Sequence, residues 1–336
     1  MTAKRVTTPR SVDVRMTSAV TRHGITLVEM LVVIAIIGII VGLTIPAIMA
    51  AREAGRRVGC QNNLRQIATA IEHHEVAHRH YPTDGWGYQW AGDPDRGFGY
   101  TQPGGWIYNI LPYIEQDNLR KTGRGLSPLD KRVSMSGVLA TPLELLHCPS
   151  RREVQTYLYG EKNFPLHNAD VPKMAAKTDY AINAGDENID AFPGPPSTVL
   201  DDLRNYRWPD HPRASGIAFV LSMTTKASVT DGLSTTVLVG EKYLAVDEYE
   251  TGISLGDDQA MYIGDDADIR RWTSAPPLPD WTNVPDIEHF GGPHNGGCYF
   301  AFCDGSVRMI RYEIDYQVFR HLGNRHDGQV IDESKL

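Results

Sequence analysis

A histidine pair with the spacing of a zinc-protease motif lies within residues 73–80. His74, Glu75 and His78 form the pattern H-E-x-x-H. On a helix, histidines at this spacing share a face and can bind zinc, while the glutamate can act as a general base. The stretch is so rich in histidine that a chance match is easy, and Tyr81 stands where the longer zinc-protease pattern requires glycine. We therefore predict packed or surface histidines, no catalytic residue and no enzyme, with a zinc hydrolase as the enzymatic alternative.

Two acidic clusters are candidates for cation binding. They are Asp257-Asp258 and Asp265-Asp266-Ala267-Asp268. Oxygen ligands that are close in sequence suit Ca²⁺. The spacing of an EF-hand is absent, however, and solvated acidic loops are common. We therefore predict no metal and no cofactor, with calcium as the alternative.

The four cysteines are Cys60, Cys148, Cys298 and Cys303, and none forms a C-x-x-C pair, which argues against a zinc ribbon. Cys298 and Cys303 are five residues apart in a predicted strand, so their side chains should point to opposite faces and should not bond each other. Cys60 and Cys148 are the better candidates for a disulfide, which would tie a long N-terminal helix to the rest of the protein. Such a bond requires a location outside the cytoplasm.

A single carboxylate, Glu29, lies near the start of a long apolar run. It is the only charged residue from Ile25 to Ile48. A helix of that length spans roughly 36 Å, enough for a hydrocarbon core about 30 Å thick. The run is too long for the apolar core of an ordinary cleaved secretory signal. A plain membrane anchor would explain the length but not Glu29, because a lone charge at membrane depth costs on the order of 3 kcal/mol.

The sequence around Glu29, GITLVEMLVVIAIIGII, is similar to the class III signal of type IV prepilins and type II secretion pseudopilins. The resemblance implies cleavage by a prepilin peptidase between Gly24 and Ile25, followed by N-methylation of Ile25. Cleavage creates a cationic α-amine. In the resembled proteins this amine, on a neighbouring subunit, pairs with the glutamate and sets the axial register during filament assembly. The resemblance therefore assigns Glu29 to assembly.

The chain departs from the commoner prepilin pattern in two ways. Ile25 replaces the usual phenylalanine, and the leader is long if translation starts at Met1 but short if it starts at Met16. Gly38 and Gly42 have the G-x-x-x-G spacing, which permits close helix approach in lipid and also arises by chance in membrane helices.

A regular stripe follows the apolar run. Its members alternate at spacings of four and three residues, which places them on one face of an amphipathic helix: Cys60, Leu64, Ile67, Ile71, His74 and His78. We predict one long helix from Ile25 to about Ala77, loosened or kinked at Pro46. Residues 1–24 would be the leader, residues 25–48 the transmembrane half, residues 49–80 the amphipathic half, and residues 81–336 a globular head.

An ordered series of short motifs resembles the bacterial family called domain of unknown function 1559. In this family the domain follows a prepilin-type N-terminus. The matching pieces are CQNNLRQI from Cys60, the LPYIEQ run, Cys148-Pro149-Ser150, DYAIN from Asp179, VTDGLSTTVLVGE ending at Glu241, and His294 followed by Asp304-Gly305. The resemblance implies a pilin-like or pseudopilin-like envelope protein and supplies no established catalytic residue. It implies an α+β fold in which the long helix packs on an antiparallel sheet with large loop insertions.

Local patterns in the head give more specific predictions. Gly105–Leu119 resembles a helix with an internal proline, and Leu143–Arg152 a strand end that runs into a turn. Residues 299–310 form a hairpin around a two-residue Asp304-Gly305 turn, which pairs Phe302 with Val307 and Phe300 with Met309. A helix over 314–322 should pack back on the sheet. The aromatic loop 82–106 should pack its rings on the core, with a carbohydrate groove as the alternative.

The charge distribution favours a single-pass membrane protein. Formal net charge is −8, yet the first 24 residues carry five basic residues against one acidic residue. A basic N-terminus and an acidic remainder fit a cytoplasmic N-terminus with an extracytoplasmic head in the bacterial inner membrane, and argue against nucleic acid as a partner. We predict a pseudopilin-like structural subunit whose partners are the prepilin peptidase/methylase, the membrane, and other pilin-like subunits or further copies of itself. The alternative is a membrane-tethered module that binds a glycan or another ligand.

Overall fold

The fold is α+β, as predicted. The computed structural model describes residues 26–160, 165–209 and 213–332, and the chain divides into two compact units, residues 1–52 and 53–336. The α-helices are α1 (Leu27–His78), α2 (Trp106–Ile110), α3 (Asp117–Lys121), α4 (Pro128–Leu139) and α5 (Tyr316–Gly323). Short 3₁₀ helices cover Leu111–Ile114, Glu144–Leu146, Ser197–Asp202, Lys226–Ser228 and Val246–Glu248.

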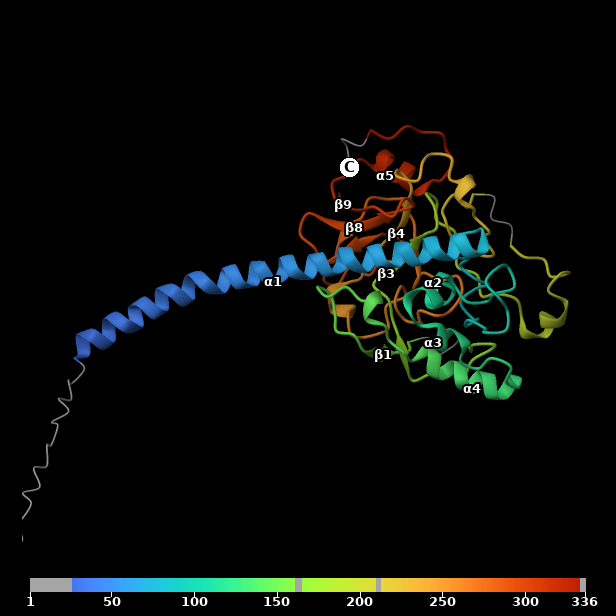
Figure 1. Cartoon of the computed structure of the whole chain (residues 1–336), viewed down its shortest axis with the longest axis horizontal. Coiled ribbons are helices and arrows are strands. Elements are labelled where there is room, and N and C mark those ends of the chain that lie inside the picture. Colours follow the sequence, from blue (N-terminus) through green and yellow to red (C-terminus); the bar gives the residue numbers. More distant parts are fainter. Residues whose placement is uncertain (1–25, 161–164, 210–212, 333–336) are drawn as a thin grey trace, which may run out of the picture. The chain divides into compact units, whose positions relative to one another are not determined.

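A mixed five-stranded sheet forms the centre of the second unit (Figure 1). Its strand order is β5-β3-β4-β8-β9, and every neighbouring pair is antiparallel except β3 and β5. The five strands are β3 (Tyr180–Asn183), β4 (Val237–Glu241), β5 (Arg270–Arg271), β8 (Gly297–Phe302) and β9 (Val307–Arg311). Two further pairs lie outside this sheet: β1 (Thr156–Leu158) with β2 (Met174–Ala176), and β6 (Leu278–Pro279) with β7 (Gly291–Gly292).

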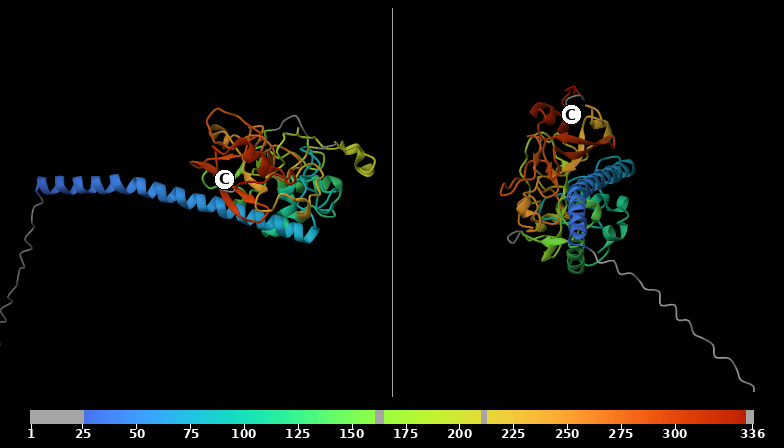
Figure 2. Two further views of the ribbon diagram at one scale, coloured as in Figure 1. Left: turned by 90° about the horizontal axis from the view of Figure 1, so that it is seen from above. Right: turned by 90° about the vertical axis from the view of Figure 1, so that its left-hand side faces the viewer.

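The second half of α1 packs on the head through the predicted stripe (Figures 1 and 2). His78 is half-buried, and the stripe residues that precede it are fully buried: Cys60, Leu64, Ile67, Ile71 and His74. The helix is continuous through Pro46 and ends at His78, after which Arg79 has a positive φ of 65°. The spacing of apolar residues therefore predicted this helix, its buried face and its end.

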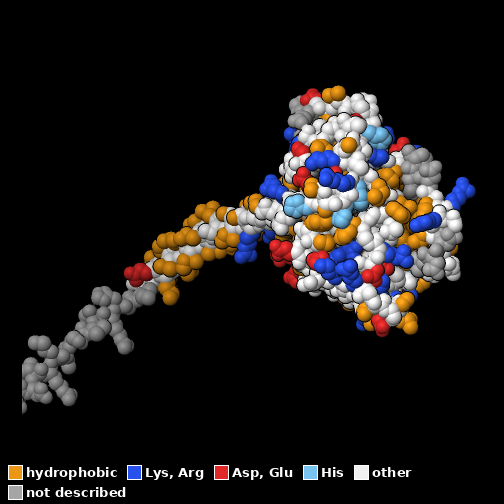
Figure 3. All heavy atoms as spheres, turned by 45° about the vertical axis from the view of Figure 1, so that its right-hand side comes forward, with side chains coloured by type: hydrophobic (Ala, Val, Ile, Leu, Met, Phe, Trp, Pro, Cys, Tyr) orange, Lys and Arg blue, Asp and Glu red, His pale blue; other side chains and the backbone are white. Residues whose placement is uncertain are grey.

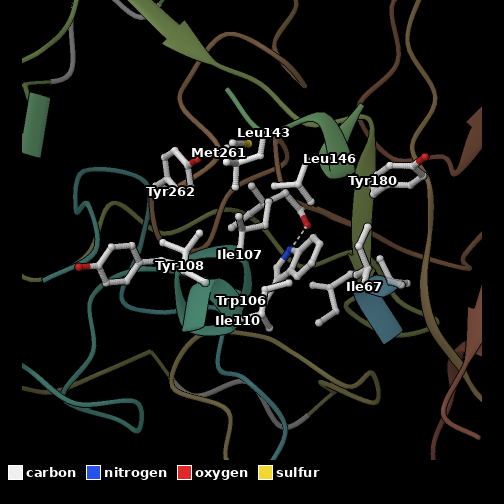
Figure 4. Close-up of a cluster of buried hydrophobic side chains, with 14 of the residues drawn as sticks. Ile67, Trp106, Ile107, Tyr108, Ile110, Leu143, Leu146, Tyr180, Met261 and Tyr262 are labelled. Atoms are coloured by element: carbon white, nitrogen blue, oxygen red, sulfur yellow. Dashed lines mark hydrogen bonds between the residues drawn. The ribbon is translucent and has the colours of Figure 1, made fainter. Parts of the chain in front are cut away.

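A single hydrophobic core joins α1 to the loops and helices that follow it (Figure 4). Trp106 at the start of α2 is fully buried beside Ile67 and Ile107, and its indole Nε1 donates a hydrogen bond of 2.8 Å to the Ile269 carbonyl. A buried indole needs such a partner because an unpaired N–H in an apolar core destabilises the fold. The contact fixes the α2 region against the segment that leads into β5.

Sheet strand β8 is buried on both faces. Phe300 and Phe302 belong to the cluster that includes Phe319 of α5, whereas Tyr299 and Ala301 belong to the larger core that includes α1. The terminal helix therefore packs on the sheet, as its apolar pattern predicted. Cys298 and Cys303 fall into different clusters, which confirms that they point to opposite faces.

The hairpin between β8 and β9 forms, but its predicted register is wrong by one residue. Ala301 pairs with Val307 and Phe300 pairs with Arg308, and the amide of Phe302 donates to the Ser306 carbonyl. A three-residue loop replaces the two-residue turn because Gly305, with φ 81°, adopts the left-handed conformation, and Asp304 does not. The Asp304 carboxylate instead accepts hydrogen bonds from the amide and hydroxyl of Ser306.

Two local predictions in the head are also wrong. The expected helix over 105–119 is divided into α2, a 3₁₀ turn and α3, because Pro112 lies at the start of the 3₁₀ turn and Glu115 has a φ of 62° that no helix accommodates. The expected strand near residue 143 is a 3₁₀ turn over Glu144–Leu146. The apolar residues of this segment are wholly or partly buried by the tertiary fold, and they do not pair with a β-strand.

Candidate functional site

Glu29 closes the N-terminus of α1 by a reciprocal hydrogen-bond pattern with Thr26. The carboxylate Oε2 accepts from the amide and from the hydroxyl of Thr26, each at 2.8 Å, and the Glu29 amide donates to the Thr26 hydroxyl at 3.2 Å. This is a capping box, which satisfies backbone amides that lack partners at a helix start. The carboxylate is thereby held at the N-terminal end of the helix.

No other described residue of its unit packs on the apolar segment of α1. α1 is the one helix among the described residues that is long and apolar enough to cross a membrane. Its large hydrophobic side chains from Leu27 to Met49 are exposed, and Figure 3 shows them as a continuous apolar surface. Among the described residues, an added Cβ at Gly38 or Gly42 would meet no other group within 4 Å. This surface is available to lipid and to other helices. Gly24 and Ile25, the predicted cleavage residues, lie outside the described residues.

The family-like motifs, far apart in sequence, converge on Cys60 of α1. Asn63, one turn after Cys60, donates to the His147 carbonyl at 2.9 Å and to the Tyr180 hydroxyl at 3.3 Å. The amide of Cys148 donates to Asp179 Oδ2 at 2.8 Å. The contacts of Asn63 with Tyr180 and of Cys148 with Asp179 each join one motif to another, so these three motifs meet in one buried region of the head.

Four side chains in this centre could bind a metal ion together. They come from α1, from the loop after a 3₁₀ turn, from the end of β4 and from the loop before β8, and their ligand atoms all lie within 4.8 Å of one another: Cys60, Cys148, Glu241 and His294. All four residues are buried. Cys60 Sγ lies 2.7 Å from Cys148 Sγ, and His294 Nε2 lies 3.7 Å from Cys148 Sγ and 3.2 Å from Glu241 Oε1. We refer to these residues as the Cys-Glu-His quartet.

Neighbouring groups hold the quartet in place. Glu241 Oε2 accepts a hydrogen bond of 2.8 Å from the Tyr299 amide of β8. His294 Nδ1 lies 3.3 Å from Oε1 of Glu53, which also accepts a hydrogen bond from the Ser150 hydroxyl. Burial acts to lower the pKa of His294, but its contacts with Cys148 and Glu241 outweigh burial and raise that pKa to about 10. Without a bound ion, the imidazolium therefore neutralises carboxylates that are otherwise costly to bury.

Cys60 and Cys148, the predicted disulfide pair, lie side by side, with their sulfur atoms 2.7 Å apart. The disulfide itself stays a prediction. Sequence reasoning missed Glu241, His294 and Glu53 as members of this centre. Glu241 is the last residue of one motif and His294 is the first residue of another. A search for metal-binding residue types at the ends of the motifs would therefore have found both.

His74 and His78 of the H-E-x-x-H pattern contact other groups of the chain. The Nδ1 atom of His74 lies 3.1 Å from the His80 carbonyl, and His78 Nε2 contacts the Tyr113 hydroxyl at 2.9 Å. The rings of His74 and His78 pack against each other and against Phe98. These contacts support the prediction that the histidines are packing residues.

The buried imidazole of His74 should make the head sensitive to moderate acid. Burial, followed by the nearby His78 and His80, lowers the pKa of His74 to about 3. Because the unfolded chain binds this proton near pH 6.5, the stabilisation is complete above pH 6.5 and is lost as the pH falls toward 3. At pH 5 the loss should be about 2 kcal/mol.

This loss can be measured by urea unfolding of residues 53–336 at pH 7.5 and at pH 5. In His74→Asn, which keeps a donor for the carbonyl, the pH-dependent loss should shrink by that amount. His73→Asn is the matched control, since His73 is exposed on the same helix. An unchanged pH dependence in His74→Asn would contradict this assignment.

Two carboxylates of the acidic clusters pair with basic side chains of the chain itself. Asp257 forms ion pairs with Arg152 and with Lys242, and Asp265 pairs with Arg270. These side chains are almost completely buried. Burial raises the pKa of Asp266 and of Asp268, which favours their neutral forms. The local charge is thus balanced by the chain's own cations, and the alternative of calcium stays untested.

The three tryptophans of the aromatic loop pack inward, as predicted, whereas Tyr100 is exposed. Trp86, Trp90 and Trp106 are buried, and the indole Nε1 groups of Trp86 and Trp90 donate to the carbonyls of Tyr100 and Pro195. Rings in this position stabilise the loop and are not available to stack on a sugar. A glycan-binding role for these three indoles therefore has no support in the geometry.

Comparisons with known proteins agree with the motif series. Residues 21–45 match the model of the prokaryotic N-terminal methylation motif. Type II secretion system core protein G of Escherichia coli (strain K12) is 29% identical over 68 residues, which are 20% of this chain and 47% of that protein. The match thus spans about half the length of that relative. No solved structure matches the chain. Residues 49–317 match the model described as Protein of unknown function (DUF1559), which covers most of the chain, including the whole Cys-Glu-His quartet, and the protein therefore belongs to the DUF1559 family.

Proposed function

We propose that this protein is a pseudopilin-like structural subunit of the bacterial envelope, anchored in the inner membrane by residues 25–48. A prepilin peptidase removes residues 1–24 and a methylase modifies Ile25. The basic leader stays in the cytoplasm and the head lies on the extracytoplasmic side, in keeping with the positive-inside rule.

The observation that carries this proposal is the position of Glu29. The N-terminal methylation motif covers residues 21–45, and within it the helix starts at Leu27 with the Glu29 carboxylate held against Thr26. The predicted cleavage would leave a cationic α-amine on Ile25, one residue before Thr26. A carboxylate at this end of an apolar helix is therefore placed to meet an α-amine of a neighbouring copy in the same membrane.

The proposed partners are other pilin-like subunits or further copies of this chain. The apolar surface of residues 27–49 is exposed on all sides within the described structure, and the spacing of Gly38 and Gly42 permits close approach of a second helix. Such packing of helices in lipid, together with the charge pair, would give an assembly its axial register.

The mature N-terminus should begin at N-methylated Ile25. Mass spectrometry of the native protein, extracted from membranes, measures cleavage and methylation together. The same gene expressed in cells that lack a prepilin peptidase is the control, and it should yield the uncleaved leader. A native protein that retains residues 1–24, or that begins beyond Ile48, would exclude the proposed function.

A further inference from the structure

We propose that the Cys-Glu-His quartet is a structural Zn²⁺ site of the head domain. Cys60, Cys148, Glu241 and His294 each direct one ligand atom into a buried volume in which all four atoms lie within 4.8 Å of one another. Four protein ligands fit tetrahedral zinc, and a set without an open position is typical of structural sites. This inference does not depend on the proposed assembly function.

The types of ligand select the metal. Two thiolates and an imidazole favour Zn²⁺ among the common divalent ions, whereas Ca²⁺ and Mg²⁺ require sets composed of oxygen ligands. The ligands are far apart in sequence and do not form a C-x-x-C pair or another short metal-binding pattern. A bound ion would link α1, the loop at Cys148, β4 and the loop before β8 at one point.

The groups that contact the quartet residues resemble those around a bound metal ion. A metal-bound histidine ordinarily donates its other ring nitrogen to a carboxylate, which fixes the ring and its tautomer. Glu53 Oε1 lies 3.3 Å from His294 Nδ1, so Nε2 is left to face the quartet. Glu241 similarly keeps Oε1 for the quartet while Oε2 accepts from the Tyr299 amide.

The charges of the centre are compatible with a bound cation. Within the described residues, His294 is the one basic side chain that forms an ion pair with Glu241. Zn²⁺ would displace the two thiol protons and the second imidazole proton, and its two positive charges would balance two of the three negative charges on Glu241 and the two thiolates. A disulfide between Cys60 and Cys148 would explain why the two sulfur atoms are close together. It would not explain why a histidine and a glutamate lie beside them. The zinc site accounts for all four residues.

The test uses the full chain, purified in detergent without chelators. Elemental analysis should find about one zinc per chain, and both Cys60 and Cys148 should be protected from alkylation until a chelator removes the metal. Cobalt in place of zinc should give thiolate-to-cobalt charge-transfer absorption and the intense visible bands of a tetrahedral ion. This readout needs no variant, so it does not depend on the folding of a mutant.

Variants then test which residues bind the ion and whether Glu53 supports His294. His294→Ala and Cys148→Ser should lose the cobalt spectrum, and Glu53→Gln should lower zinc affinity about 10- to 100-fold. Cys298→Ser is the matched control, because Cys298 is equally buried and lies outside the quartet. A Cys60–Cys148 disulfide in the native protein without zinc would overturn the proposal. Free thiols that bind neither zinc nor cobalt when the ions are added would also overturn it.

Discussion

Replacing Glu29 with alanine is expected to abolish assembly of this chain with pilin-like subunits while leaving its membrane insertion unchanged. A carboxylate at membrane depth costs on the order of 3 kcal/mol, and pairing with the α-amine of a neighbour offsets that cost. Loss of the pair should weaken association on the order of a hundredfold. Chemical cross-linking in intact membranes, scored as the ratio of oligomer to monomer, measures this change.

The neutral variant Glu29→Gln separates the two roles that the structure allows for this residue. Glutamine at this position preserves the capping box with Thr26 but removes the negative charge. If the charge pair sets assembly, Glu29→Gln should fail to assemble in the same way as Glu29→Ala. Normal assembly of Glu29→Gln would instead show that capping of the helix is the whole function of the residue. Equal processing at Gly24 in all variants is the control for expression and insertion.

Replacing Arg152 with methionine is expected to destabilise the head by about 3–5 kcal/mol, since it breaks a buried ion network. The guanidinium pairs with Asp179 at 2.9 Å and with Asp257 at 2.5 Å, and all three side chains are almost completely buried. Burial alone would raise the pKa of Asp257, but Arg152 and Lys242 outweigh it and hold that pKa below its ordinary value. The variant therefore leaves buried carboxylates with too little positive charge.

Urea unfolding of residues 53–336 at neutral pH measures this effect. Arg132→Met is the matched control, because Arg132 forms a solvent-exposed ion pair with Asp170 and its loss should change stability by about 0–1 kcal/mol. If the two variants unfold at the same urea concentration, the buried network does not stabilise the head. Because the pKa of Asp257 is lowered, its stabilisation is present above about pH 4 and is lost as the pH falls further.

The sequence predicted the features that depend on neighbouring residues along the chain. The apolar run and the stripe from Cys60 to His74 predicted α1, its exposed half and its buried half, because helical periodicity is a local property. The hairpin at Asp304-Gly305 was predicted for the same reason. Its register was not, since one glycine with a positive φ selects a three-residue loop over a two-residue loop.

The tertiary structure decided which distant residues meet. Cys60 and Cys148 could be paired by eliminating the other cysteines, but the approach of Glu241 and His294 depends on the order of strands in the sheet and on the path of the loop before β8. The sequence of the acidic clusters indicated possible cation sites. In the fold, Arg152, Lys242 and Arg270 form ion pairs with carboxylates of these clusters. Periodicity describes which face of an element is buried. Only the packing of elements that are far apart in sequence determines what that face contacts.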